Sequence, residues 1–84
     1  MNAEKILATV AHTLQTTLNV GPIAINRQTR ALEVRGWDSL SHTLILTSLE
    51  EAFQCQLPLE AFFQAKNVGE VVDLLASILN APRP

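Results

Sequence analysis

Apolar residues recur every three to four positions in three stretches of the chain, which is the spacing of amphipathic α-helices. In residues 3–18 the apolar stripe consists of Ile6, Leu7, Val10, Ala11, Leu14 and Leu18. In residues 39–53 it consists of Ile45, Leu46, Leu49 and Phe53. In residues 68–79 it consists of Val68, Val71, Val72, Leu75, Ile78 and Leu79. The pattern therefore predicts three main helices.

Polar and special residues mark the ends of these helices. Asn2 and Asn67 precede the first and last stretches, where an asparagine side chain can cap the unpaired N–H groups of a helix. Glu70 follows Asn67 by three residues, which resembles a capping box. Gly21-Pro22 is expected to end the first helix.

A fourth, shorter helix is predicted over residues 58–64. Pro58 suits the first position of a helix, where its missing N–H is not needed. Leu59, Phe62 and Phe63 give this segment an apolar side. Together the four segments predict an all-α fold: a small four-helix bundle with three main helices, a short third helix, and a long loop between helices 1 and 2.

The long loop covers residues 19–37 and is too apolar for a free linker. Its apolar residues are Ile23, Ile25, Leu32, Val34 and Trp37. A loop of this length in a small domain is usually functional or held against the core. We expect it to be held chiefly through Leu32. A strand over residues 22–25 fits the local pattern but has no evident partner.

The size of the chain sets limits on its organisation. With 84 residues, 48% of them hydrophobic, it corresponds to one domain near the lower size limit for independent folding. We expect residues 1–84 to form a single domain with an ordered core of about 3–79 and a frayed end at 81–84. Cys55 is the only cysteine, so the chain cannot form an internal disulfide.

Charge and hydropathy exclude several classes of partner. The net charge is −2, which gives no electrostatic support for nucleic acid binding. No apolar run approaches the roughly 18 residues of a membrane-spanning helix. The N-terminal residues do not have the pattern of a signal peptide. We therefore expect a monomer in the cytoplasm, without nucleic acid or membrane partners.

Ser39 stands where the loop meets the second helix, in Gly36-Trp37-Asp38-Ser39-Leu40. Local sequence favours a helix cap, supplied by Ser39 or by Asp38; in the second case the Ser39 hydroxyl would point outward. A hydrolase nucleophile would need a base and an oxyanion hole, and a bundle of this size offers only His12 and His42 toward that machinery. The third interpretation is covalent attachment, because the start of a helix favours a phosphate.

The region around Ser39 is similar to that of acyl carrier proteins. The resemblance is carried by Asp38-Ser39-Leu40, Leu49-Glu50-Glu51-Ala52-Phe53, Leu57-Pro58, and Val68 at the start of the last helix. It runs from about Leu32 to Leu79, and the first helix and long loop agree in length and pattern. Asp-Ser-Leu alone is a weak motif, but the combination at this spacing is specific.

The resemblance implies a cofactor and a role. Ser39 would carry 4′-phosphopantetheine, transferred from coenzyme A by a separate Mg²⁺-dependent phosphopantetheinyl transferase, with Asp38 and Leu40 beside it in the cofactor-binding site. The thiol of this arm would hold acyl or aminoacyl groups as thioesters. The chain would not be an enzyme; it would serve an acyl- or aminoacyl-loading enzyme and downstream synthases. Cys55 would then be a small packing residue.

The outward face of the second helix is the expected docking surface for these enzymes. We assign to docking Leu40, Thr43, Leu44, Thr47 and Glu50 of this face, together with Phe62 of the short third helix. Carriers of fatty acid synthesis are usually more acidic here. Trp37-Asp38-Ser39-Leu40 followed by His42 is more similar to stand-alone carriers of natural-product pathways, polyketide or mixed polyketide–peptide. The alternatives are a carrier for fatty acid synthesis and a helical docking module without cofactor.

Two residues flank the serine motif. His42 lies one turn after Ser39 and would either cover the phosphate side of the arm or, as we favour, pack at the edge of the second helix's core stripe. Trp37 is expected to anchor the loop against the bundle, with its indole N–H on a polar partner.

Overall fold

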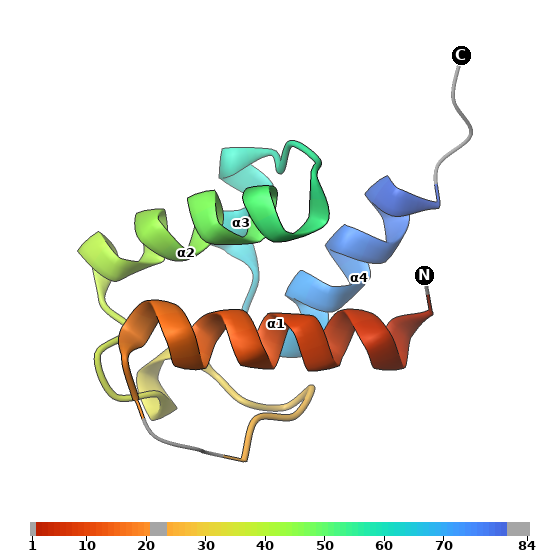
Figure 1. Cartoon of the computed structure of the whole chain (residues 1–84). Coiled ribbons are helices and arrows are strands. Elements are labelled where there is room, and N and C mark those ends of the chain that lie inside the picture. The colour runs from red at the N-terminus through yellow and green to blue at the C-terminus, as the bar shows by residue number, and fades with distance from the viewer. Residues whose placement is uncertain (1, 21–23, 81–84) are drawn as a thin grey trace.

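The computed structural model describes residues 2–20 and 24–80, and these residues form an all-helical bundle without strands (Figure 1). Its elements are α1 (Ala3–Leu18), the 3₁₀-helix η1 (Ala31–Glu33), α2 (Ser39–Phe53), α3 (Leu59–Gln64) and α4 (Val68–Leu79). The predicted fold class is confirmed. Residues 21–23 and 81–84 lie outside the described residues, as do the predictions that fall on them: Gly21-Pro22, the first half of the strand over 22–25, and the frayed end.

The core lies between α1, α2 and α4. Helix α1 runs along one side of the bundle and packs against both α2 and α4, while the short α3 contacts α2 and α4 (Figure 1). The buried cluster comprises Ile6, Val10, Leu14, Ile45, Leu46, Leu49, Phe53, Leu57, Phe62, Val68, Val71, Val72 and Leu75. Most of these residues belong to the three predicted stripes, so the helical spacing identified the faces that pack together.

Local polar groups set the helix ends. Asn2 Oδ1 accepts a hydrogen bond from the Lys5 N–H at 2.9 Å, and Asn67 Oδ1 accepts one from the Glu70 N–H at 2.9 Å. Both predicted caps are confirmed. The capping box is displaced by one residue, because the Glu70 carboxylate accepts from the Lys66 N–H, at 3.3 Å.

Of two other helix ends, that of α1 falls at the predicted residue, and the start of α3 falls one residue later than predicted. α1 ends at Leu18, where Asn19 adopts the left-handed conformation (φ 52°) and its N–H reaches the Gln15 and Thr16 carbonyls. Asparagine tolerates this conformation better than most residues, so the helix stops before Gly21. Pro58 is the residue before α3 rather than its first residue.

The loop between α1 and α2 is held to the bundle, but the expected anchor is wrong. Leu32 is 83% exposed, because the η1 turn points it outward, whereas Val34 is only 5% exposed. Ile25 and Trp37 are half-buried and pack against the core.

Backbone groups also hold this loop, at the start of α4. The Val68 and Gly69 N–H groups donate to the carbonyls of Thr29 and Arg27, both at 2.8 Å. The first N–H groups of a helix lack partners within it, so the loop satisfies them. The Arg27 guanidinium extends the contact by pairing with the Asp73 carboxylate at 2.8 and 2.9 Å.

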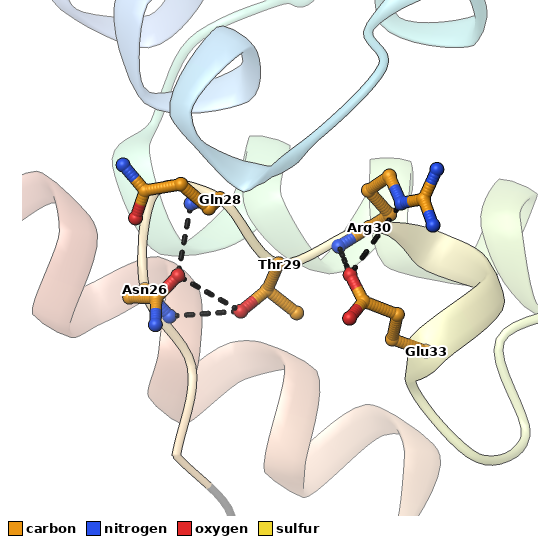
Figure 2. A network of polar contacts seen from close by, with 5 residues as sticks. All are labelled: Asn26, Gln28, Thr29, Arg30 and Glu33. Carbon is orange, nitrogen blue, oxygen red and sulfur yellow. Dashed lines mark hydrogen bonds and ion pairs between the residues drawn. The ribbon is translucent and has the colours of Figure 1, made fainter.

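Short-range polar contacts shape the loop between these attachments (Figure 2). Asn26 Oδ1 accepts from the Gln28 N–H at 2.9 Å, and the Thr29 hydroxyl accepts from the Asn26 N–H at 3.0 Å. Further along, the Glu33 carboxylate accepts from the Arg30 N–H at 2.8 Å. These turns, together with η1, give the loop a defined path toward α2.

Candidate functional site

The start of α2 is capped by Asp38. Its Oδ1 accepts a hydrogen bond from the Ser41 N–H at 2.8 Å, and its backbone carbonyl accepts from the His42 N–H at 2.9 Å. Ser39 is therefore the first residue of the helix and does not cap it. Of the two capping interpretations, the structure selects Asp38.

The Ser39 side chain is exposed. Within the described part of the chain, no hydrogen bond engages its hydroxyl. A serine that neither caps the helix nor packs in the core contributes little to the fold at this position. Its hydroxyl is accessible to another protein.

The start of α2 combines a partly positive helix end with one negative side chain, Asp38. Ser39 lies in the first turn, where unpaired N–H groups and the helix dipole give partial positive charge. Asp38 is ionised, because hydrogen bonds from Ser41 lower the pKa of its carboxyl. That carboxylate accepts a hydrogen bond from the Ser41 N–H. The residues present thus fit a phosphodiester on Ser39 that extends into solvent.

Trp37 and His42 form a hydrogen-bonded pair beside the serine. The Trp37 indole N–H donates to His42 Nδ1 at 2.8 Å. The His42 ring stacks on Phe62, with ring centroids 4.3 Å apart, and meets Phe63 edge-on at 4.5 Å. Burial lowers the pKa of His42, partly offset by a hydrogen bond with the Phe62 backbone.

These contacts test the predictions made for His42 and Trp37. His42 packs at the edge of the core, as favoured, rather than over the phosphate. Trp37 has the expected polar partner, but sequence reasoning did not identify it as His42. The only sequence signal for this pair was that His42 follows Trp37 by five residues, across the start of a helix. That spacing does not by itself imply contact.

The expected docking residues divide into two groups. Leu40 and Leu44 are 76% and 54% exposed, and Thr43 and Thr47 are exposed beside them. Glu50 is half-buried, and its Oε2 accepts from the Leu57 N–H at 2.9 Å, which holds the turn between α2 and α3.

The assignment of Phe62 to the docking surface is wrong, because its side chain is fully buried under His42. Its neighbour Phe63 is 47% exposed and was missed. α3 has only six residues, and its short pattern did not show which phenylalanine faces the core.

The described residues give little support for a reactive cysteine, a metal site or a membrane-spanning helix. Cys55 is half-buried, and burial, reinforced by the Glu50 charge, raises the pKa of its thiol, which disfavours the reactive thiolate. No group of three or more His, Cys, Asp or Glu side chains there is placed to hold a metal ion. None of the described helices is long and apolar enough to cross a membrane.

Comparison with known proteins decides the family. Residues 6–75 match the family described as "Phosphopantetheine attachment site". The chain belongs to this family. It is also similar in structure to the holo acyl carrier protein from Geobacter metallireducens, solved by solution NMR. The identity is 30%, over 88% of this chain and 85% of that one, with a TM-score of 0.80. No curated protein sequence matched.

The predicted cofactor and role follow from this membership. The chain is an acyl carrier protein with a phosphopantetheine prosthetic group. Such carriers are not catalysts; they are substrates for partner enzymes, among them phosphopantetheinyl transferases and synthases.

Proposed function

We propose that the phosphopantetheine arm is attached to Ser39 through a phosphodiester on its Oγ. One observation at the start of α2 carries this proposal. Asp38 caps the helix, whereas the Ser39 side chain is exposed and its hydroxyl makes no hydrogen bond to the described residues. Ser39 also lies inside the matched residues 6–75. A modifying enzyme could therefore reach the hydroxyl without unfolding any part of the helix.

The arm gives the chain its chemistry. Its terminal thiol holds an acyl or aminoacyl group as a thioester, and the carrier presents that group to successive enzymes. Tethering makes each encounter intramolecular once the carrier has docked, which raises the effective concentration of the group at the active site. The fold itself contributes a rigid platform and a recognisable surface.

Intact mass spectrometry tests the attachment site. The purified chain is incubated with coenzyme A, Mg²⁺ and a broad-specificity phosphopantetheinyl transferase, and we expect one phosphopantetheine to add. Ser39→Ala should gain no mass. Ser41→Ala is the matched control, since it removes a hydroxyl from the same helical turn, and it should be modified normally. Modification of Ser39→Ala, or none of the wild type, would contradict the proposal.

We further propose that the carrier serves a polyketide or mixed polyketide–peptide pathway. The first turn of α2 contains no acidic residue, and the exposed side chains on the outward face are Leu40, Thr43, Leu44 and Thr47. This surface departs from the acidic α2 usual in carriers of fatty acid synthesis, which is the competing assignment. A docking module without cofactor is the third candidate, and the mass experiment separates it from both.

The same surface predicts how the carrier binds its partners. An uncharged face provides little electrostatic steering, so association should depend weakly on ionic strength. We expect the KM of the transferase for the carrier to change little between low and high salt. Leu44→Ala should raise that KM several-fold by removing apolar contact, while Glu60→Gln on α3 should not. A steep rise of the wild-type KM with salt would contradict an apolar docking surface.

A further inference from the structure

The contacts of His42 connect three elements near the proposed attachment site. Its Nδ1 accepts from Trp37 in the loop, at 2.8 Å. Its ring lies against Phe62 and Phe63 of α3, while its own backbone belongs to the first turn of α2. An indole N–H can only donate, so Nδ1 must be unprotonated for this hydrogen bond to exist.

After the Asp38 cap itself, the Trp37 side chain is the next side-chain anchor of the loop that leads into Ser39. Gly36, just before it, has a positive φ of 87°, and the Trp37 N–H donates to the Val34 carbonyl at 3.2 Å. The loop thus makes a tight turn after the buried Val34 and enters the helix within a few residues. The Trp37–His42 bond ties that turn to the helix.

The charged side chains near this pair do not engage it. On the loop these are Arg35 and Asp38, and on α3 the charged residue is Glu60; all three are exposed. The causes that act on His42 are burial and the Phe62 backbone, with no contribution from a neighbouring charge. Whether Nδ1 is free to accept therefore depends on the proton of His42 itself.

We propose that His42 is a positioning residue for the modification of Ser39, acting through Trp37. While Nδ1 accepts the indole N–H, the loop holds the serine in the geometry that the transferase binds. Protonation of Nδ1, or loss of either partner, releases the loop and lowers the fraction of carrier in that geometry. This inference rests on the proposed attachment at Ser39.

The hydrogen bond between Trp37 and His42 sets the expected size of the effect on transferase binding. Losing one ordinary hydrogen bond shifts an equilibrium about five-fold. When only part of the carrier is competent, the apparent affinity falls in proportion to the competent fraction. Trp37→Phe and His42→Phe each keep an aromatic ring but remove the bond, so each should raise the KM of the transferase for the carrier by up to about five-fold. The kcat should stay unchanged, and the double variant should be no worse than either single one.

A second measurement does not depend on the transferase. Trp37 is the only tryptophan, so its fluorescence reports this site alone. Emission of the wild type should titrate with a midpoint below 6.5, the ordinary pKa of histidine. His42→Phe should abolish this transition. His12→Gln, which removes the exposed histidine of α1, should preserve it.

The outcomes separate this inference from the proposed function. A wild type that gains no phosphopantetheine overturns the function and the inference with it. A wild type that is modified, together with folded Trp37→Phe and His42→Phe variants of unchanged KM, overturns the inference alone. So does Trp37 emission that titrates equally with and without His42. Circular dichroism of the variants confirms that the helices remain.

Discussion

Two adjacent side chains, Asp38 and Ser39, have different tasks at the start of α2. The Asp38 carboxylate satisfies the Ser41 N–H, and this hydrogen bond defines where the helix begins. Because the cap comes from the preceding residue, the modification that we propose at the Ser39 hydroxyl would leave this hydrogen bond in place. A serine that capped its own helix would lose that interaction on attachment of a phosphate.

The Asp38 cap predicts an acid-sensitive contribution to stability. Hydrogen bonds from Ser41 lower the pKa of Asp38 below its ordinary 3.8, so the unfolded chain binds this proton more readily than the folded one. The stabilisation is present above pH 3.8 and is lost as the pH falls through the lowered pKa. Asp38→Asn keeps a hydrogen-bond acceptor but has no charge to lose. As the pH falls below 3.8, its thermal unfolding midpoint should therefore fall less than that of the wild type.

The comparison has an internal control. Asp38→Ala removes the acceptor altogether and should unfold at a lower temperature than Asp38→Asn at neutral pH. Thermal unfolding followed by circular dichroism measures all three proteins. Identical acid dependence of the wild type and Asp38→Asn would show that this carboxylate does not contribute.

At the scale of elements, the main helices and a long loop held to the bundle could be predicted, but the residues that hold the loop could be predicted only in part. The ranges 3–18, 39–53 and 68–79 agree with α1, α2 and α4, because apolar spacing and cap residues are local signals. The loop is attached partly through the backbone carbonyls of Arg27 and Thr29. Every residue has such a carbonyl, so the sequence does not indicate which ones bind α4.

The errors in the loop and at the candidate site have the same origin. The choice between Leu32 and Val34 depends on the η1 turn, and the choice between Phe62 and Phe63 depends on how a six-residue helix lies on the core. The pairing of Trp37 with His42 depends on the path of the loop around Gly36. Each is settled by tertiary contacts, whereas the place of Ser39 in the first turn follows from neighbouring residues.

The attachment of the loop to α4 makes Gly69 a sensitive position. A Cβ added there would lie 2.9 Å from the Arg27 carbonyl oxygen, the same atom that accepts the Gly69 N–H. Alanine would gain up to about 1 kcal/mol of helix propensity but cost about 1–3 kcal/mol of overpacking against backbone that cannot move without losing the hydrogen bond. We expect Gly69→Ala to lower the free energy of unfolding in urea.

Ser77→Ala provides the matched control for this substitution. Ser77 is exposed on the same helix, so its replacement should change the stability by less than about 0.5 kcal/mol. If Gly69→Ala proved as stable as the wild type, the loop would have to accommodate the methyl group, and its contact with α4 would be looser than the structure shows.

For the whole molecule, stability rests on one small apolar core. With a single cysteine the chain has no internal disulfide, and 84 residues bury a smaller share of their surface than a larger domain does. At about 0.05–0.15 kcal/mol per residue, the total stability is roughly 4–13 kcal/mol. One large core residue can therefore account for a substantial part of it.

Phe62 is the largest fully buried side chain, and it connects the core to the site. It lies beneath His42, so its removal opens a cavity and also takes away the stack that orients the Trp37–His42 pair. Phe62→Ala should cost about 3–5 kcal/mol, enough to leave much of the protein unfolded near 37 °C if the total lies at the low end of its range. Phe63→Ala, on the next residue and half exposed, should remain folded with a much smaller loss. Thermal unfolding by circular dichroism distinguishes the two, and equal losses would mean that α3 does not anchor the bundle through Phe62.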